Sequence, residues 1–510
     1  MTHRMDAGDA APRAEALAAA LEALELAVAD RGILAGLSAE DRVRLQKAAG
    51  QLARPGPEER RRLRRALSRG QRESRKARDG ALRGAAGIQL LRRAPRYPTP
   101  APRGAGDGTG GSAPSPEYDV PRKCYVCKAP YRTLHHFYDQ LCPRCGDENH
   151  ARRVATADLR GRVAIVTGAR VKIGYQAALM LLRAGCRVVS LTRFPRDAAA
   201  RYAQEPDFPG WRDRLQILGV DLRHTPSVQR LCRHLDARLP RLDFQIHNAC
   251  QTVRRPPGFY AHLVGGEMRP AADLPSSQRE LLREDEELRA GAGAAGARRP
   301  ALLSQLPTEA DLLLPGTGDL EFFPRGLVDR DLQQVDQRTH NSWRLRLREV
   351  PTLELIEVLL VNAAAPFVMT ARLEGLMLRG RAAPPGTATS GDPTKHVVMV
   401  SAMEGQFYRG HKTDRHPHTN MAKAALNMLV RTSAPDLLRG GIHLNAVDTG
   451  WVTDEDPIQL AARKAEEHGF SPPLDVVDGA ARVLAPILDG FRTGEHAAGV
   501  FYKDYRPASW

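Results

Sequence analysis

The first fifty residues place hydrophobic and polar side chains with the period of an α-helix. In residues 14–30 the apolar positions share one helix face. They are Leu17, Leu21, Leu24 and Val28. Ser38 followed by Asp41 forms a capping pattern that predicts a second helix through about Leu52.

An arginine-rich stretch from about residue 58 to residue 93 predicts a third helix. Four glycines are expected to interrupt it: Gly70, Gly80, Gly84 and Gly87. The pattern therefore predicts a helical, basic region over residues 1–93. Pro and Gly dominate residues 94–121, where the periodicity disappears, so a linker is predicted there.

From Gly161 the pattern changes to short apolar runs that alternate with helical segments. A buried strand is predicted at Val163–Val166, a helix over residues 175–184 that ends at Gly185, and a second strand at Arg187–Thr192. Further strands are predicted at Leu215–Val220, Leu242–His247, His396–Val400, Ile442–Val447 and Gly499–Tyr502. This alternation predicts the α/β class, a doubly wound parallel sheet of the Rossmann type over residues 158–510.

Residues 122–150 contain two CxxC pairs separated by fourteen residues. Their cysteines are Cys124, Cys127, Cys142 and Cys145. Four thiolates at this spacing predict a closed, structural Zn²⁺ site in a small zinc-ribbon-like module. His135 and His136 lie between the pairs and are interpreted as surface or packing residues, although either could replace a ligand.

The formal net charge of +16 is unevenly placed along the chain. Residues 51–100 carry 15 Lys and Arg against 4 Asp and Glu. Such a basic arm could bind nucleic acid or an acidic partner, or be a solvated helix. Nucleic acid is the weakest of these interpretations, because no aromatic residue lies between Arg60 and Arg93 to stack on bases.

The composition narrows the class of protein further. At 42% hydrophobic and 26% charged residues the chain is typical of a soluble globular protein. No run reaches about 18 consecutive apolar residues, so no membrane span is expected. The first residues lack a secretory or transit pattern, and seven cysteines do not make a disulfide scaffold. A reducing, cytoplasmic location is the expectation.

Several motifs in residues 158–505 resemble the short-chain dehydrogenase/reductase family. The glycine loop matches the family's TGxxxGxG at Thr167, Gly168, Ile173 and Gly174. The resemblance implies dinucleotide contacts from further residues after later strands. These are Asp221 and Leu222 for adenine, Asn248 and Ala249 in a variant of NNAG, and Thr449, Gly450 and Thr453 in the loop over nicotinamide.

The same resemblance implies an active site. Asn362 matches the family's active-site Asn, Ser401 its catalytic Ser, and Lys423 the Lys of YxxxK, which also binds ribose. Thr419 stands where the family has its proton-transferring tyrosine. An aliphatic hydroxyl is too weak an acid for that role, since a phenol has a pKa of about 10. We expect Tyr408 to carry the proton instead, with His416 and His418 as alternatives.

The second departure from the family concerns the cofactor. Lys172 replaces the middle glycine of the loop, and either blocks the pyrophosphate or supplies a cation to it. The second strand ends at Arg193 instead of an acid, and Arg170 adds charge nearby. A guanidinium there can pair with a 2′-phosphate, so NADP(H) is favoured over NAD(H).

The family core carries an insertion of about residues 264–335. Asn248 and Asn362 lie 114 positions apart, far more than the family's usual couple of dozen. The insertion is predicted to contain a charged surface helix followed by disordered Gly and Ala, and to act as a lid, a partner-binding arm or a tolerated surface loop. Arg254 and Arg255 before it could attract an anionic substrate or pair with acids of the insertion.

The sequence thus predicts an NADP-dependent oxidoreductase of the short-chain type acting on a carbonyl or alcohol. The missing tyrosine keeps a second hypothesis open, a catalytically impaired NADP-binding sensor or scaffold. In both, residues 1–150 are expected to recruit a protein partner, and the resemblance implies a homodimer or tetramer.

Overall fold

The computed structural model describes residues 10–94, 100, 115–291, 299–306, 322–379, 394–408 and 412–510. It separates into two compact units, Met1–Arg78 and Asp79–Trp510. The sequence pattern places this boundary at residue 93 instead. Each unit is described by itself.

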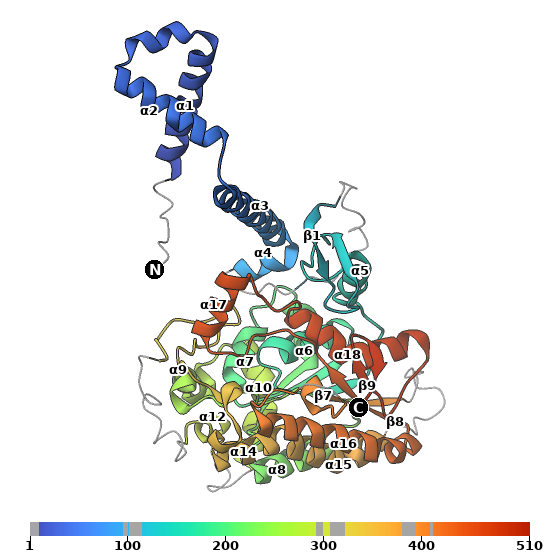
Figure 1. The fold of residues 1–510 in the computed structure, drawn as a ribbon. Coiled ribbons are helices and arrows are strands. Elements are labelled where there is room, and N and C mark those ends of the chain that lie inside the picture. The colour runs from blue at the N-terminus through green and yellow to red at the C-terminus, as the bar shows by residue number, and fades with distance from the viewer. Residues whose placement is uncertain are drawn as a thin grey trace. The chain divides into compact units, whose positions relative to one another are not determined.

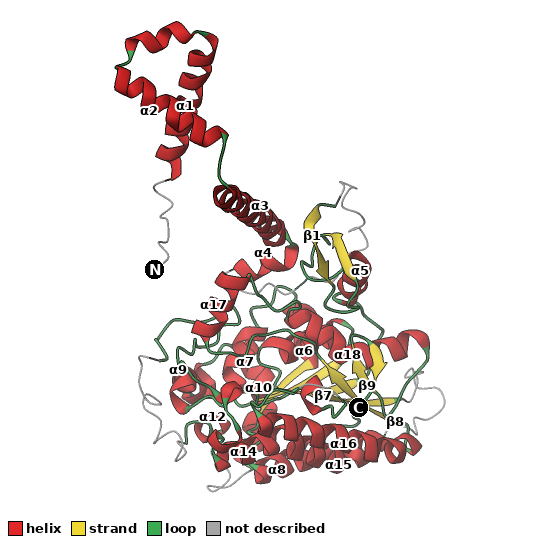
Figure 2. Cartoon of the chain, in the orientation of Figure 1, coloured by secondary structure: helices red, strands yellow, loops and turns green. Residues whose placement is uncertain are grey.

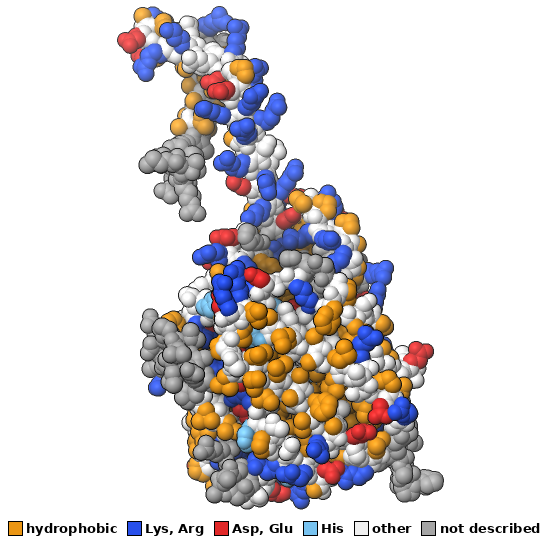
Figure 3. Space-filling model, turned by 60° about the horizontal axis from the view of Figure 1, so that its bottom comes forward, with side chains coloured by type: hydrophobic (Ala, Val, Ile, Leu, Met, Phe, Trp, Pro, Cys, Tyr) orange, Lys and Arg blue, Asp and Glu red, His pale blue; other side chains and the backbone are white. Residues whose placement is uncertain are grey.

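The described part of the first unit is helical. It contains α1 (Ala10–Ala29), a 3-10 turn (Arg31–Gly36), α2 (Ala39–Ala53) and most of α3 (Pro57–Ala85). Ser38 Oγ accepts from the Asp41 amide at 3.0 Å, so the predicted cap is confirmed. Gly70, Gly80 and Gly84 lie inside α3, and their predicted interruptions are wrong. Each costs only about 1 kcal/mol in a helix of otherwise strong helix formers. Lys and Arg side chains line α3 (Figure 3).

The second unit begins with the end of α3 and with α4 (Gly87–Arg93). These residues pack on the cysteine segment: Ile88 is buried, and its amide donates to the Phe137 carbonyl at 2.8 Å. The cysteine segment contains β1 (Glu117–Lys123), β2 (Pro130–Thr133) and α5 (Pro143–Arg152). Ordered structure therefore begins within the predicted linker, whose residues 95–99 and 101–114 lie outside the described ones.

An eight-stranded sheet forms the centre of the second unit (Figures 1 and 2). Its order is β10-β9-β8-β7-β6-β3-β4-β5, parallel except for β10. The strands are β3 (Val163–Thr167), β4 (Arg187–Thr192), β5 (Leu215–Gly219), β6 (Phe244–His247), β7 (Lys395–Ser401), β8 (Ile442–Asp448), β9 (Phe501–Lys503) and β10 (Arg506–Ala508). The predicted doubly wound α/β fold is confirmed. The strand order reverses between β3 and β6, where such sheets open a crevice.

Helices cover both faces of this sheet (Figure 1). One face packs against α6 (Lys172–Arg183), α7 (Pro195–Tyr202) and α18 (Val476–Thr493). The other packs against α8 (Thr225–Arg238), α15 (Ala365–Leu378) and α16 (Pro417–Arg439). Burial of Val, Ile and Leu on both faces explains why the strands read as continuous apolar runs.

The insertion is part of this body. It follows α9 (Pro257–Met268) and contains α10 (Ser276–Ala290) and α12 (Pro300–Leu303). The expected surface helix is wrong for α10, because Leu281 and Leu282 are buried and Asp285 accepts from the amide of Gly219 on β5 at 2.7 Å. The predicted Gly/Ala tract, residues 292–298, lies outside the described residues.

One helical stretch, Thr352–Leu378, is long and apolar enough to cross a membrane by length and composition alone. It comprises α14 (Thr352–Leu359), a π-helical turn (Leu360–Ala364) and α15. Met369 and Leu373 of α15 belong to the core against the sheet, so we interpret the stretch as a core helix.

Candidate active site

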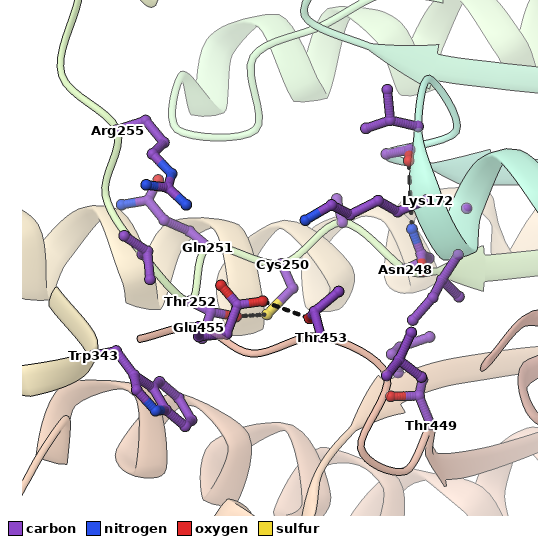
Figure 4. A pocket seen from close by; sticks show the side chains of 18 of the residues that line it. Lys172, Asn248, Cys250, Gln251, Thr252, Arg255, Trp343, Thr449, Thr453 and Glu455 are labelled. Carbon is purple, nitrogen blue, oxygen red and sulfur yellow. Dashed lines mark hydrogen bonds between the residues drawn. The ribbon is translucent and has the colours of Figure 1, made fainter. Parts of the chain in front are cut away.

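A cleft of about 1140 Å³ lies where the parallel strands end. Residues that follow β3, β4, β5, β6, β7 and β8 line it. Figure 4 shows side chains from the segments after β3, β6 and β8, among them Lys172, Asn248 and Thr453. Of the residues predicted for the dinucleotide and active site, Asn362 and Tyr408 do not line it, and neither do the alternative proton carriers His416 and His418. The structure thus brings together groups that lie more than 280 positions apart in the chain, from Thr167 to Thr453.

The glycine loop after β3 forms a close-packed cradle. Gly168 has φ +68°, and a Cβ on Gly174 would collide with the Gly168 carbonyl and with Asn248 Nδ2. Asn248 Nδ2 donates to the Thr167 carbonyl at 3.1 Å, and the Ala249 amide donates to Thr167 Oγ1 at 2.9 Å. The ends of β3 and β6 are therefore tied together beneath the loop.

Lys172 adopts the left-handed backbone, φ +55°, for which a glycine would be favoured. Its side chain extends into the cleft (Figure 4). The sequence left two interpretations, a lysine that blocks the pyrophosphate or one that supplies a cation to it. A side chain directed into the cleft fits the cation.

Arg193 directly follows β4 and lies beside two aromatic rings, those of Phe194 and Tyr260. Its guanidinium lies over Tyr260 at 4.6 Å and donates to the Tyr260 hydroxyl at 2.7 Å. Burial acts to raise the pKa of Tyr260, but Arg193, Arg255 and Arg170 outweigh it and lower that pKa below its usual value. The expected free charge of Arg170 is corrected, because Arg170 is buried and paired with Asp197 at 2.7 Å.

The acid expected at adenine is also paired. Asp221 is buried and forms an ion pair with Arg223 at 2.7 Å. Burial would raise the pKa of Asp221, but the hydrogen bonds and charge of Arg223 lower it. Leu222 beside it is buried in the cleft wall. Arg223 additionally pairs with Glu357, so the Asp221 carboxylate stays ionised and oriented.

Ser401 and Lys423 lie at the other end of the cleft, both buried. Ser401 Oγ donates to Asn427 Oδ1 at 2.5 Å, and Lys423 Nζ donates to the Val400 carbonyl at 2.7 Å. Asn362 lies in the π-helical turn and clamps Gln251, accepting from its amide at 2.9 Å and donating to its carbonyl at 3.1 Å. Asn362 therefore shapes the loop after β6 behind the lining.

The structure separates the candidate proton carriers. Thr419 lines the cleft, and its buried hydroxyl has no hydrogen-bond partner among the described residues. The hypothesis for Tyr408 is corrected: the turn Met403–Gly405 after β7 leads Tyr408 out to solvent, 57% exposed and away from the cleft lining. His416 stacks on Trp343 at 3.8 Å, and burial lowers its pKa to about 4. His418 is buried beside Glu354, also outside the lining.

The segment just after the insertion is hydrogen bonded to the residues that follow β8. Asn341 Nδ2 donates to the Glu455 carbonyl at 2.8 Å, and Gln459 Nε2 donates to the Gln337 carbonyl at 2.6 Å. Arg255 pairs with Asp336, so it follows the alternative in which it meets an acid near the insertion. The preceding residue, Arg254, forms an ion pair with Glu357 at 3.1 Å.

Some lining residues have no counterpart in the sequence prediction. They are Tyr125, Lys128, Tyr260, Trp343 and Glu455. Glu455 accepts from Thr453 Oγ1 at 2.7 Å, in the loop predicted to cover nicotinamide. Cys250 is exposed and lines the cleft, with its sulfur 3.3 Å from Thr252 Oγ1 (Figure 4). No motif in the sequence marks these five residues as part of the cleft.

The four cysteines of the module form one cluster. Their sulfur atoms lie within 4.8 Å of one another. Cys124 and Cys145 are buried, and Cys142 caps the start of α5. His135 is buried, and its Nδ1 accepts from the Phe137 and Tyr138 amides, which agrees with a packing role. The donor set suits a soft divalent ion.

Comparisons with known proteins agree with this geometry. Residues 162–261 match the family model described as short chain dehydrogenase. The chain is 31% identical over 386 residues to the uncharacterized protein R665 of Acanthamoeba polyphaga mimivirus, covering 72% of this chain and 71% of that protein. It is 36% identical over 104 residues to dehydrogenase/reductase SDR family member 13 of Bos taurus, covering 20% and 27% of the two chains.

A solved structure, the Pseudomonas aeruginosa RhlG/NADP active-site complex, is similar with a TM-score of 0.40 and 18% identity, covering 68% of this chain and 94% of that one. Residues 162–261, which contain the glycine loop and the first strands of the doubly wound sheet, are therefore similar to the short-chain dehydrogenases.

Proposed function

We propose that the cleft binds NADP(H) and that the chain transfers a hydride between this cofactor and a carbonyl or alcohol group of a small molecule. The observation that carries the proposal is the tightly packed loop after β3, where a Cβ on Gly174 would collide with the Gly168 carbonyl and Asn248 Nδ2, so that glycine is needed for the loop to turn into α6 at the edge of the cleft. The amino end of α6 begins at Lys172 in the same loop, and a helix amino end favours phosphate.

The preference for NADP(H) rests on the charges at the end of β4. Arg193 donates to the hydroxyl of Tyr260, and it lines the cleft beside the rings of Phe194 and Tyr260. The next acid in the chain, Asp197, forms ion pairs with Arg170 and Arg201. A ribose 2′-phosphate would therefore meet a cation here, and a ribose hydroxyl would find no free carboxylate among the residues named.

Reversing this charge should reverse the cofactor preference. We expect Arg193→Asp to weaken NADPH binding about ten- to hundredfold, the loss of one charge-assisted contact, and to strengthen NADH binding. Fluorescence titration with both nucleotides measures the change. Arg187→Asp is the matched control, because it lies at the far, exposed end of the same strand. An unchanged ratio of the two dissociation constants in Arg193→Asp would refute the assignment.

NADP(H) supplies or accepts the hydride when bound; the chain's groups must orient the substrate and move the proton. Ser401 is the hydroxyl in the cleft placed to polarise a carbonyl oxygen, and Asn427 fixes its orientation. Lys423 presents an ammonium group at the same end, where it favours negative charge on a neighbouring oxygen. Thr419 contributes shape here, because its hydroxyl cannot release a proton near neutral pH.

A second function, NADP(H) binding without turnover, is favoured by a separate observation. The two polar groups at the reactive end are already engaged within the protein, Ser401 with Asn427 and Lys423 with the Val400 carbonyl. A chain of this kind would act as a sensor or scaffold. Binding of NADPH with no oxidation by any member of a panel of aldehydes, ketones and quinones would establish this second function over the first.

We propose in addition that the cysteine cluster holds a structural Zn²⁺. The four sulfur atoms lie within 4.8 Å of one another, and those of Cys127 and Cys142 are 3.7 Å apart, close to the edge of a tetrahedron with metal–sulfur bonds of about 2.3 Å. Metal analysis of the purified chain is expected to find a single zinc ion per molecule, and Cys142→Ser to lose it. A wild-type chain purified without chelators and free of metal would contradict the site.

A further inference from the structure

The first cysteine pair carries a tyrosine into the cleft. Tyr125 stands between Cys124 and Cys127, and both Tyr125 and Lys128 belong to the lining. The Tyr125 hydroxyl accepts from the Trp451 amide at 2.9 Å. Trp451 lies in the loop Thr449–Thr453, which follows β8 and also lines the cleft. One hydrogen bond therefore links the cysteine module directly to this loop.

The position of Tyr125 is set by the module itself. Its amide donates to the Gln140 carbonyl at 2.9 Å, two residues before Cys142. Lys128 folds back over the same residue, with its ammonium 4.8 Å from the centre of the Tyr125 ring and hydrogen bonded to the Tyr125 carbonyl. Because both cysteine pairs flank these contacts, an ion shared by the four sulfur atoms would fix the ring.

The loop Thr449–Thr453 is held by hydrogen bonds to residues on either side of it in the structure. Gly450 has φ +75°, and its amide donates to Asp448 Oδ1 at 2.9 Å. The Trp451 carbonyl accepts from the Leu474 amide at 3.3 Å, and its amide is held by Tyr125. The main chain of Trp451 is thus held on both sides, once by the body and once by the module.

Packing extends the connection to the glycine loop. The module and the loop share one apolar cluster, in which Val452 and Leu474 pack with Cys124 and Cys145, and Ile173 of the cradle packs against it. Arg153, at the end of α5, forms buried ion pairs with Asp475 at 2.7 Å and Asp478 at 2.9 Å at the start of α18. Because protein interiors are closely packed, a displacement of the cysteine module would be transmitted through these contacts to the loop and the cradle.

We propose that the cysteine module is a working part of the dinucleotide site: a metal ion in it fixes Tyr125, Tyr125 positions the loop Thr449–Thr453, and metal occupancy thereby sets the affinity for NADP(H). This inference rests on the proposed function of the cleft. Tyr125 acts as a positioning residue through Trp451. By linkage, the factor by which metal strengthens NADP(H) binding equals the factor by which NADP(H) strengthens metal binding.

The test measures this factor from both directions. The dissociation constant of NADPH is determined by fluorescence for the zinc-loaded and the chelator-stripped full chain, and we expect it to rise about tenfold on stripping. The zinc affinity is determined by competition with a chromophoric chelator, with and without NADPH, and should change by the same factor. Tyr125→Phe keeps the ring and removes the acceptor, so it should shrink the factor on both sides. Tyr131→Phe is the matched control, because among the described residues that hydroxyl bonds to the Asp139 carbonyl, inside the module.

Hydrogen exchange separates this inference from the proposed function. Stripping the metal, or Tyr125→Phe in the loaded protein, is expected to speed amide exchange in residues 449–453 even without nucleotide. Failure of the zinc-loaded wild type to bind NADPH would overturn the proposed function. Amide exchange in residues 449–453 would still show whether Tyr125 and the metal position this loop. Unchanged exchange in this loop for Tyr125→Phe, or equal NADPH affinity with and without metal, would overturn the inference.

Discussion

Replacing Gly174 by alanine is expected to abolish NADP(H) binding. A Cβ at this position would overlap the Gly168 carbonyl and Asn248 Nδ2, well inside the 3.0 Å that real Cβ atoms observe. One of the colliding atoms is backbone, so the loop itself must move. Asn248 would also lose its hydrogen bond to the Thr167 carbonyl, which ties β6 to β3. We expect an affinity loss of at least about a hundredfold and a cost of about 1–3 kcal/mol in the free energy of unfolding.

The measurement combines NADPH titration with urea unfolding of the same preparation. Gly375→Ala is the matched control: it is a helical glycine in α15 with no atom within 4 Å of the added Cβ. There alanine should stabilise the chain by up to about 1 kcal/mol and leave NADPH binding unchanged. If Gly174→Ala bound NADPH as tightly as the wild type, the loop after β3 could not be the pyrophosphate cradle.

The sheet was predictable because each strand carries its own signal. Buried parallel strands are apolar along their whole length, and turn residues bound them, so Val163–Thr167 and Ile442–Asp448 are visible without any partner. The strand β10 lacks such a signal. It has three residues and follows a tight turn in which Asp504 and Tyr505 take positive φ without a glycine.

The site was predictable only as far as backbone motifs determine it. The glycine loop and the strand ends bring their residues together wherever this fold forms. Long-range pairing decides the rest: Tyr260 meets Arg193 from 67 residues away, and Asp197 neutralises Arg170. The direction of a loop is likewise invisible in sequence, which is why Tyr408 looked well placed after Ser401 and instead faces solvent.

Lys423→Met is expected to separate turnover from binding. Methionine matches the length of the lysine stem and removes the buried ammonium at the reactive end of the cleft, together with its hydrogen bond to the Val400 carbonyl. If the chain transfers hydride, NADPH consumption with its best carbonyl substrate should fall about 10²–10⁴-fold, because the charge that assists proton transfer is lost. The free energy of unfolding should fall by about 1.5–3 kcal/mol, the net value of one hydrogen bond to a charged group. Steady-state and single-turnover rates measure the loss, and circular dichroism verifies the fold.

Two substitutions at Thr419 test whether its hydroxyl takes part in proton transfer. Thr419→Val removes a hydroxyl that has no partner among the described residues and keeps its shape, so turnover and stability should stay close to those of the wild type. Thr419→Tyr restores the tyrosine four residues before Lys423 and places a phenol at the cleft lining, where turnover should rise. If Thr419→Val eliminated turnover while Lys423→Met did not, the proton would travel through the threonine and the assignment of roles would be reversed. If neither the wild type nor Thr419→Tyr consumed NADPH despite binding it, the cleft would serve binding alone, because the restored acid would then lack a substrate to protonate.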